Sequence, residues 1–85
     1  MKPGDLVKRT EVWKDRVDSV RVFLMRDTEK FDEKVCELRY DKLALVITTK
    51  QDVWGEGFIA NYALVLYEGR YGWVLQGELD VVSGA

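Results

Sequence analysis

Four aromatic side chains and one arginine are the residues of this sequence best suited to binding a ligand. They are Trp54, Tyr67, Arg70, Tyr71 and Trp73. Aromatic rings beside a groove can bind extended peptides, modified side chains or stacked bases, and an arginine can add a contact to phosphate. The alternative is that the rings complete a small core, because large aromatic side chains contribute strongly to burial. The core is favoured for each ring except that of Trp73, for which the two interpretations are evenly matched.

The sequence disfavours catalysis and metal binding. It contains no histidine and a single cysteine, Cys36, which removes the Ser-His and Cys-His pairs and any plausible set of structural zinc ligands. Four acidic residues lie between positions 27 and 33, but they lack the spacing and the central glycine of an EF-hand loop. A solvated surface loop accounts for them better. We therefore predict no catalytic residue, no metal site and no cofactor.

Length and charge indicate one small soluble domain. A chain of 85 residues is expected to form a single domain over residues 1–85, with modest stability. The formal net charge is -2 with acids and bases interspersed, which disfavours duplex nucleic acid as a partner. The lone cysteine, and the lack of a signal-like N-terminus or a long apolar run, favour a cytoplasmic protein with no membrane partner.

Most of the chain predicts β structure. Apolar runs of strand length, rich in β-branched and aromatic residues, alternate with turn residues from position 43 onwards. A connecting loop is expected over residues 50–57, and a turn over residues 68–72, where Gly69 and Gly72 are available for positive φ. Residues 76–78 predict a break before the last strand. The expected strands cover residues 6–7, 43–49, 58–67, 73–75 and 79–82.

The segment between residues 10 and 41 fits two patterns. Residues 20–25 alternate as a strand does, although Val20 and Leu24 also have helical spacing. Phe31, Val35 and Leu38 fit one face of a helix whose first turn contains Thr28. We expect a strand over residues 20–25 and a short helix over residues 29–38, and a strand remains the alternative for the second segment.

Two short motifs resemble the small SH3-like barrel proteins of tailed bacteriophages and bacteria. The first is the opening turn PGDLV, and the second is GWV in residues 72–74, followed after a short break by Leu79. The resemblance implies a barrel with Val74 inside and Trp73 on the outer surface. The expected fold is therefore mainly β, an SH3-like small barrel with an elaborated segment over residues 10–41. Its predicted core contains Leu6, Val46, Val65, Val74 and Leu79.

The apolar strand over residues 58–67 bears on assembly and function. Both of its faces carry large apolar side chains, so its outer face needs cover. We expect the elaborated segment to provide it within a monomer, by packing Phe23 or Leu24 against Leu64 or Leu66. The predicted function is a non-catalytic binding or assembly module for a protein or peptide. The alternative is a module that binds single-stranded nucleic acid on its aromatic side chains.

Overall fold

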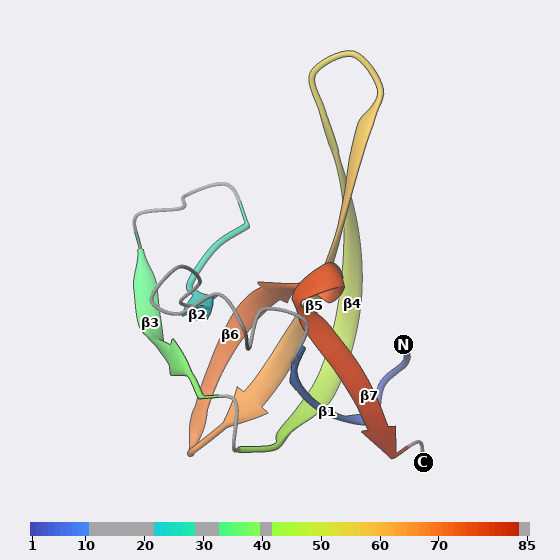
Figure 1. Cartoon of the computed structure of the whole chain (residues 1–85). Helices are drawn as coiled ribbons and strands as arrows, with labels where there is room; N and C mark the ends of the chain where they lie inside the picture. Colours follow the sequence, from blue (N-terminus) through green and yellow to red (C-terminus); the bar gives the residue numbers. More distant parts are fainter. Residues whose placement is uncertain (11–21, 29–32, 40–41, 84–85) are drawn as a thin grey trace.

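The protein forms a curled antiparallel sheet of seven strands in a computed structural model, which describes residues 1–10, 22–28, 33–39 and 42–83 (Figure 1). The described part is mainly β, as the sequence predicts, and its curled sheet is compatible with a small β-barrel. None of its helices is long and apolar enough to cross a membrane. The elements are β1 (Leu6–Arg9), β2 (Val22–Met25), β3 (Lys34–Leu38), β4 (Ala44–Trp54), β5 (Phe58–Tyr67), β6 (Arg70–Leu75), η1 (Gln76–Glu78) and β7 (Leu79–Ser83). Their order in the sheet is β3-β2-β6-β5-β4-β1-β7.

Strands β4, β5 and β6 form the centre of the sheet. The predicted strand over residues 58–67 is confirmed as β5, and the break over residues 76–78 is confirmed as the 3-10 turn η1. Glu68 and Gly69 form the turn between β5 and β6, with φ of 51° and 77°. The expectation of positive φ at Gly72 is wrong, because Gly72 lies inside β6 opposite Val65.

The hairpin of β4 and β5 extends beyond the rest of the sheet (Figure 1). The loop expected over residues 50–57 is wrong in its first part, because β4 continues to Trp54 and only Gly55, Glu56 and Gly57 form the turn. We call residues 51–61 the arm, since β4 and β5 pair there only with each other among the described strands. Gln51 is exposed on this ribbon, so a polar residue fits a strand there as well as a loop.

The elaborated segment adds two strands to one edge of the sheet. The strand expected over residues 20–25 is confirmed for Val22–Met25. The expected helix is wrong for residues 34–38, which form β3 instead, and residues 29–32 lie outside the described part. Pairing with β2 decides the outcome, because it places Leu38 opposite Val22 and buries both side chains. Such a partner strand outweighs the weak local preference for a helix.

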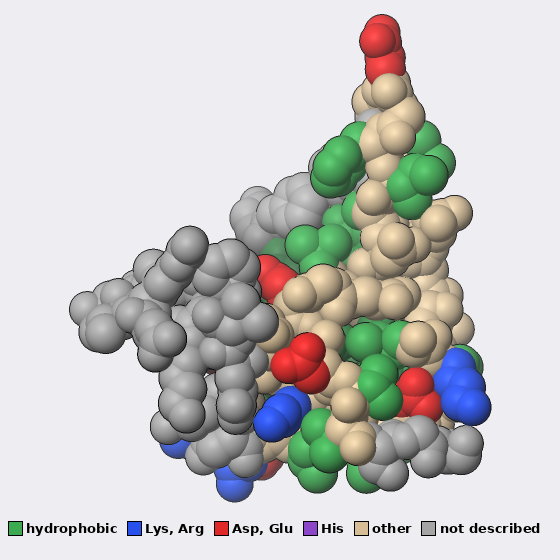
Figure 2. Space-filling model, turned by 45° about the vertical axis from the view of Figure 1, so that its right-hand side comes forward, with side chains coloured by type: hydrophobic (Ala, Val, Ile, Leu, Met, Phe, Trp, Pro, Cys, Tyr) green, Lys and Arg blue, Asp and Glu red, His purple; other side chains and the backbone are tan. Residues whose placement is uncertain are grey.

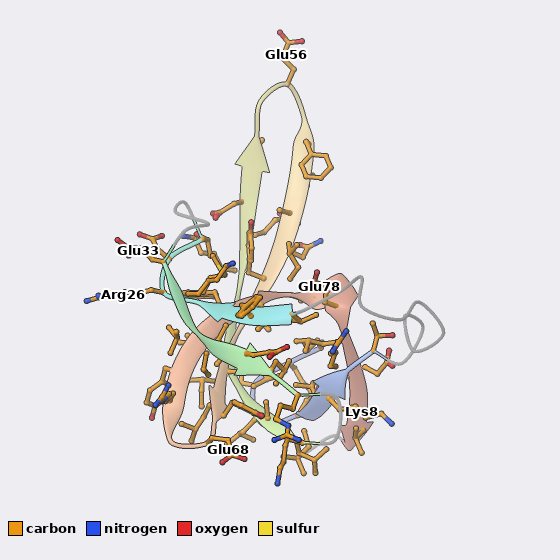
Figure 3. The ribbon with its side chains drawn as sticks, turned by 60° about the vertical axis from the view of Figure 1, so that its left-hand side comes forward. Lys8, Arg26, Glu33, Glu56, Glu68 and Glu78 are labelled. Carbon is orange, nitrogen blue, oxygen red and sulfur yellow. The ribbon has the colours of Figure 1, made fainter. Side chains whose placement is uncertain are left out.

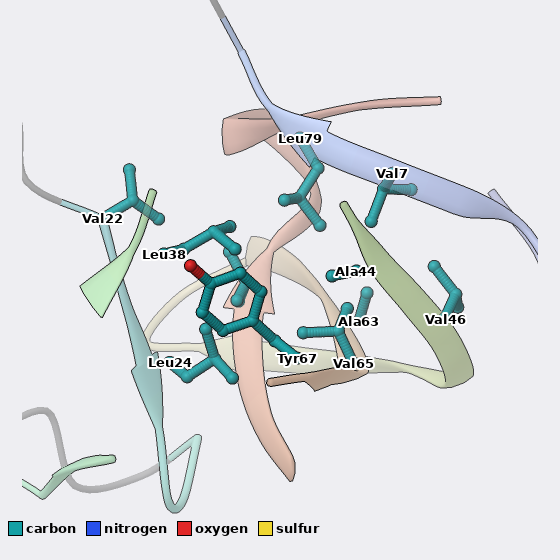
Figure 4. Close-up of a cluster of buried hydrophobic side chains, with 11 residues drawn as sticks. Val7, Val22, Leu24, Leu38, Ala44, Val46, Ala63, Val65, Tyr67 and Leu79 are labelled. Atoms are coloured by element: carbon teal, nitrogen blue, oxygen red, sulfur yellow. The ribbon is translucent and has the colours of Figure 1, made fainter. Parts of the chain in front are cut away.

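One apolar core lies inside the curled sheet (Figure 4). Four of the five predicted core residues are confirmed there, namely Val46, Val65, Val74 and Leu79. Leu6 is only partly buried and Val7 takes its place, so the predicted alternation of β1 is wrong by one residue. The pairing of β1 with β7 shifts register between Leu6 and Val7, and such an irregularity changes which side chain faces inwards.

Leu24 also belongs to this inner core. The expectation that Leu24 would pack on the outer face of β5 is therefore wrong, because β2 extends the sheet rather than lying across it. Phe23 points to the other face of β2, where the amine of Lys34 lies 4.4 Å from the centre of its ring. The elaborated segment thus contributes core side chains through two added strands.

Candidate functional site

The structure separates the five residues that the sequence singles out. Tyr67 lies in the core with 4% of its surface exposed, and its hydroxyl accepts a hydrogen bond from the Arg39 amide at 3.3 Å. Tyr71 and Trp73 share the outer face of β6, where Tyr71 is 58% exposed and Trp73 is partly buried. Trp54 ends β4, and its side chain lies outside the described part.

Arg70 starts β6 with an exposed side chain, and its Nη1 donates a hydrogen bond to the carbonyl oxygen of Val35 at 3.5 Å. Its guanidinium group therefore lies beside β3. Tyr71 and Trp73 remain together on one surface, whereas Tyr67 cannot offer its ring to a ligand on that surface.

A polar cluster adjoins Trp73 on the outer face. The Lys50 amine donates a hydrogen bond to the Thr28 hydroxyl at 3.0 Å, and it lies 3.5 Å from Oδ1 of Asp52. The same amine lies 5.9 Å from the centre of the Trp73 ring, within the range of a cation–π interaction. Lys50 thereby links β4 to the residues that follow β2. Its charge is already engaged by these neighbours.

A hollow of about 400 Å³ lies where the arm meets the body of the protein. Its volume falls within the roughly 300–1,000 Å³ typical of ligand sites. One wall is the start of β5 and the other is η1 with the residue before it. The lining residues are Phe58, Ile59, Ala60, Asn61, Tyr62, Leu75, Gln76, Gly77 and Glu78.

The apolar side chains at this hollow are unusually open to solvent. Phe58 is 69% exposed and Ile59 is 51% exposed, and Val53, which pairs with Ile59 across the arm, is 69% exposed. Figure 2 shows hydrophobic side chains along the arm, below its acidic tip. Val53 and Ile59 share one face of the arm and Phe58 lies on the other, and large exposed apolar side chains of this kind are typical of an interaction site.

Two hydrogen bonds hold η1 in place beside β5. The Gln76 side-chain amide donates to the carbonyl oxygen of Tyr62 at 3.1 Å. The Thr10 amide donates to the carbonyl oxygen of Glu78 at 2.9 Å, which ties η1 to the end of β1. The fold therefore fixes the η1 wall of the hollow.

In comparisons with protein-family models, curated proteins and solved structures, no match to this chain was found. The candidate site therefore depends on geometry alone.

Among the described residues that line the hollow, Glu78 is the one with a charged side chain. Burial raises the pKa of its carboxyl group above the usual value, and the positive charge of Arg9 opposes this shift. Figure 3 shows Glu78 near the base of the arm and Glu56 at its tip. The described residues contain no group of three or more acidic or cysteine side chains that could hold a metal ion.

Phe58, Ile59 and Leu75 are site residues that the sequence motifs do not single out. A signal was present, because the strand over residues 58–67 has apolar side chains on both faces and starts directly after a glycine turn. The prediction from sequence is that the elaborated segment covers these additional apolar side chains. The excess at Phe58 and Ile59 instead reflects a stretch of strand that leaves the body of the protein.

Proposed function

We propose that this protein is a non-catalytic binding module whose partner is another protein, bound at the arm and the hollow beside it. The observation that carries the proposal is the exposure of Val53, Phe58 and Ile59 on one ribbon next to a preformed hollow. Apolar and aromatic side chains that become fully desolvated supply most of the affinity in protein interfaces. No Lys or Arg is among the described residues that line the hollow, which favours a protein over a nucleic acid at this surface.

Selection from a library of displayed random peptides tests this proposal. Peptides selected on the whole chain should shift the amide NMR signals of Phe58–Tyr62 and of the η1 residues. Ile59→Thr should weaken their binding about tenfold or more, as expected for an interface anchor. Val82→Thr is the matched control, because Val82 is 50% exposed and also lies in a strand. Failure to select any peptide, or signal shifts confined to other surfaces, would contradict the proposal.

Binding of single-stranded nucleic acid is the second candidate function. It is favoured by Tyr71, whose exposed ring lies on the same face of β6 as Trp73. Bases would stack on these rings, and Arg70 would contact the backbone phosphates. Titration of a labelled oligonucleotide at low salt distinguishes the two candidates. Binding that falls with added salt and weakens in Tyr71→Ala would favour this second function, whereas we expect no binding at high micromolar concentration.

We also propose that the protein is a monomer related to the SH3-like small barrels that its motifs resemble. The order of the described elements supports this relationship, with the first strand beside the last and a central meander that ends in a 3-10 turn. Tyr62 on the outer face of β5 is buried within the single chain, which leaves it no role in an interface between copies. Light scattering tests the monomer, and a dimer at low concentration would contradict it.

A further inference from the structure

Among the described strands, none pairs with one edge of β5 where it enters the arm, and we call this the free edge. Strand β6 pairs with β5 as far as Leu75, opposite Tyr62, and the chain then turns away into η1. Before Tyr62, β5 pairs with β4 on one side, and no strand of the described chain pairs with its other side. An unpaired edge presents main-chain N–H and C=O groups with which another strand can pair. The hollow lies along this edge.

The turn between β5 and β6 identifies the main-chain groups at the free edge. Positive φ at both Glu68 and Gly69 defines a two-residue turn of type I′, so its flanking residues Tyr67 and Arg70 form a hydrogen-bonded pair. Successive residues of a strand point their main-chain groups to alternate neighbours. The pairing of β5 with β6 has no register shift. Tyr67 and every second residue before it in β5, as far as Ile59, therefore point their main-chain groups to the β6 side. Ile59 therefore presents its N–H and C=O to the hollow.

The side chains at this edge define the chemistry of a segment that could pair there. Phe58, Ile59 and Leu75 offer apolar surface, which suits apolar side chains at alternate positions of an added strand. Two carboxylates, that of Glu78 in the hollow and that of Glu56 at the tip of the arm, favour Lys or Arg at the ends of that strand. A two-stranded ribbon is only marginally stable alone, so a third strand would also stabilise the arm.

We propose that the hollow binds an extended segment of a partner protein as a β-strand added to β5, with alternating apolar side chains and a basic residue at an end. This inference rests on the proposed function, because it specifies how that surface binds. Main-chain hydrogen bonds supply the pairing, and the apolar pockets select the side chains. The added strand continues the position of β6 in the sheet beyond Leu75.

Hydrogen exchange of the Ile59 amide tests the pairing directly. The probe is the tightest peptide selected from the displayed library, added in excess to the whole chain. We expect exchange of the Ile59 N–H to slow about tenfold or more, because a free main-chain donor gains a hydrogen bond. The Ala60 N–H points towards β4 and should change less. Unchanged exchange at Ile59 in the saturated complex would overturn the proposal.

Two further comparisons separate strand addition from binding through side chains alone. The selected peptide, N-methylated in turn at each central residue, should lose up to about tenfold in affinity at the positions that donate to β5. Ile59→Pro removes the N–H of the free edge and should weaken the peptide more than Ile59→Thr does. Proline is tolerated on a strand edge that faces solvent, so the fold of Ile59→Pro should persist. Amide NMR signals of its core residues at the wild-type positions would confirm that it does.

The outcomes distinguish this proposal from the proposed function. If every N-methylated peptide binds as tightly as its parent and still shifts the signals of the hollow, strand addition is wrong and protein binding stands. If no peptide is selected at all, both are wrong. If the Ile59 amide becomes protected on raising the concentration of the protein alone, a second copy occupies the edge, and the proposal of a separate partner is overturned.

Discussion

Gly72 in β6 lies directly against the side chain of Leu24 in β2. A methyl group at position 72 would overlap Cβ of Leu24 and lie 2.9 Å from its Cγ. Both residues are buried, so neither can move into solvent to relieve the contact. The absence of a side chain at Gly72 is what allows β2 to bring Leu24 into the core beside β6.

Gly72→Ala should therefore lower the free energy of unfolding by about 1–3 kcal/mol, the usual cost of overpacking a core. Urea denaturation measures this change. Gly77→Ala is the control, because a Cβ at Gly77 would meet no atom within 4 Å. A Gly72→Ala variant as stable as the wild type would show that β2 does not approach β6 this closely.

The core position of Leu79 gives a second expectation. Leu79→Ala should lower the free energy of unfolding by about 2–4 kcal/mol, because it removes a buried side chain and leaves a cavity. Val82 in the same strand is half exposed, so the free energy of unfolding of Val82→Ala should stay within about 0.5 kcal/mol of the wild-type value. Equal effects of the two substitutions in urea denaturation would contradict the assigned faces of β7.

The buried hydroxyl of Tyr67 gives a third expectation. Tyr67→Phe removes the acceptor for the Arg39 amide and should cost about 1 kcal/mol of stability. Tyr71→Phe makes the same chemical change on an exposed ring and should cost almost nothing. Thermal unfolding of the two variants compares them directly, and a larger loss for Tyr71→Phe would reverse the placement of the rings.

Glu78 makes the stability depend on pH. Its pKa is raised in the folded state by burial, so the folded protein holds this proton more tightly than the unfolded chain does. Stability from this group is thus greatest below the unfolded pKa of about 4.5, and it falls as pH rises through the raised folded value. At neutral pH the ionised carboxylate destabilises the fold.

Glu78→Gln should accordingly be more stable than the wild type at pH 7, and this advantage should shrink towards pH 4. Urea denaturation across this range measures the difference. Glu56→Gln at the tip of the arm is the control and should change stability at pH 7 less than Glu78→Gln does. If Glu78→Gln lowers stability at pH 7, the attraction to Arg9 outweighs the cost of burial.

Local patterns in the sequence predict the central part of the fold. The run over residues 58–67 gives both ends of β5, since glycine-containing turns bound it on each side. The GWV motif places Val74 inside, and the structure leaves it 2% exposed. These features depend on neighbours within a few residues, which a single sequence contains.

The remaining features depend on contacts between distant residues. The choice of a strand for residues 34–38 follows from pairing with β2, and the role of Gly72 follows from contact with Leu24. The inward position of Val7 follows from a register shift against β7. The hollow is formed by β5 and η1 together, so neither segment alone indicates a site.

The pairing of β1 with β7 has a consequence for the rate at which the protein folds. Leu6 pairs with Ser83, so this ladder joins opposite ends of the chain and closes the longest loop in the sheet. The β5–β6 hairpin closes through a two-residue turn and can form much earlier. We expect a transition state in which this hairpin is already built and β7 is still detached. Substitutions in β7 should then mainly speed unfolding, while those in the hairpin should mainly slow folding.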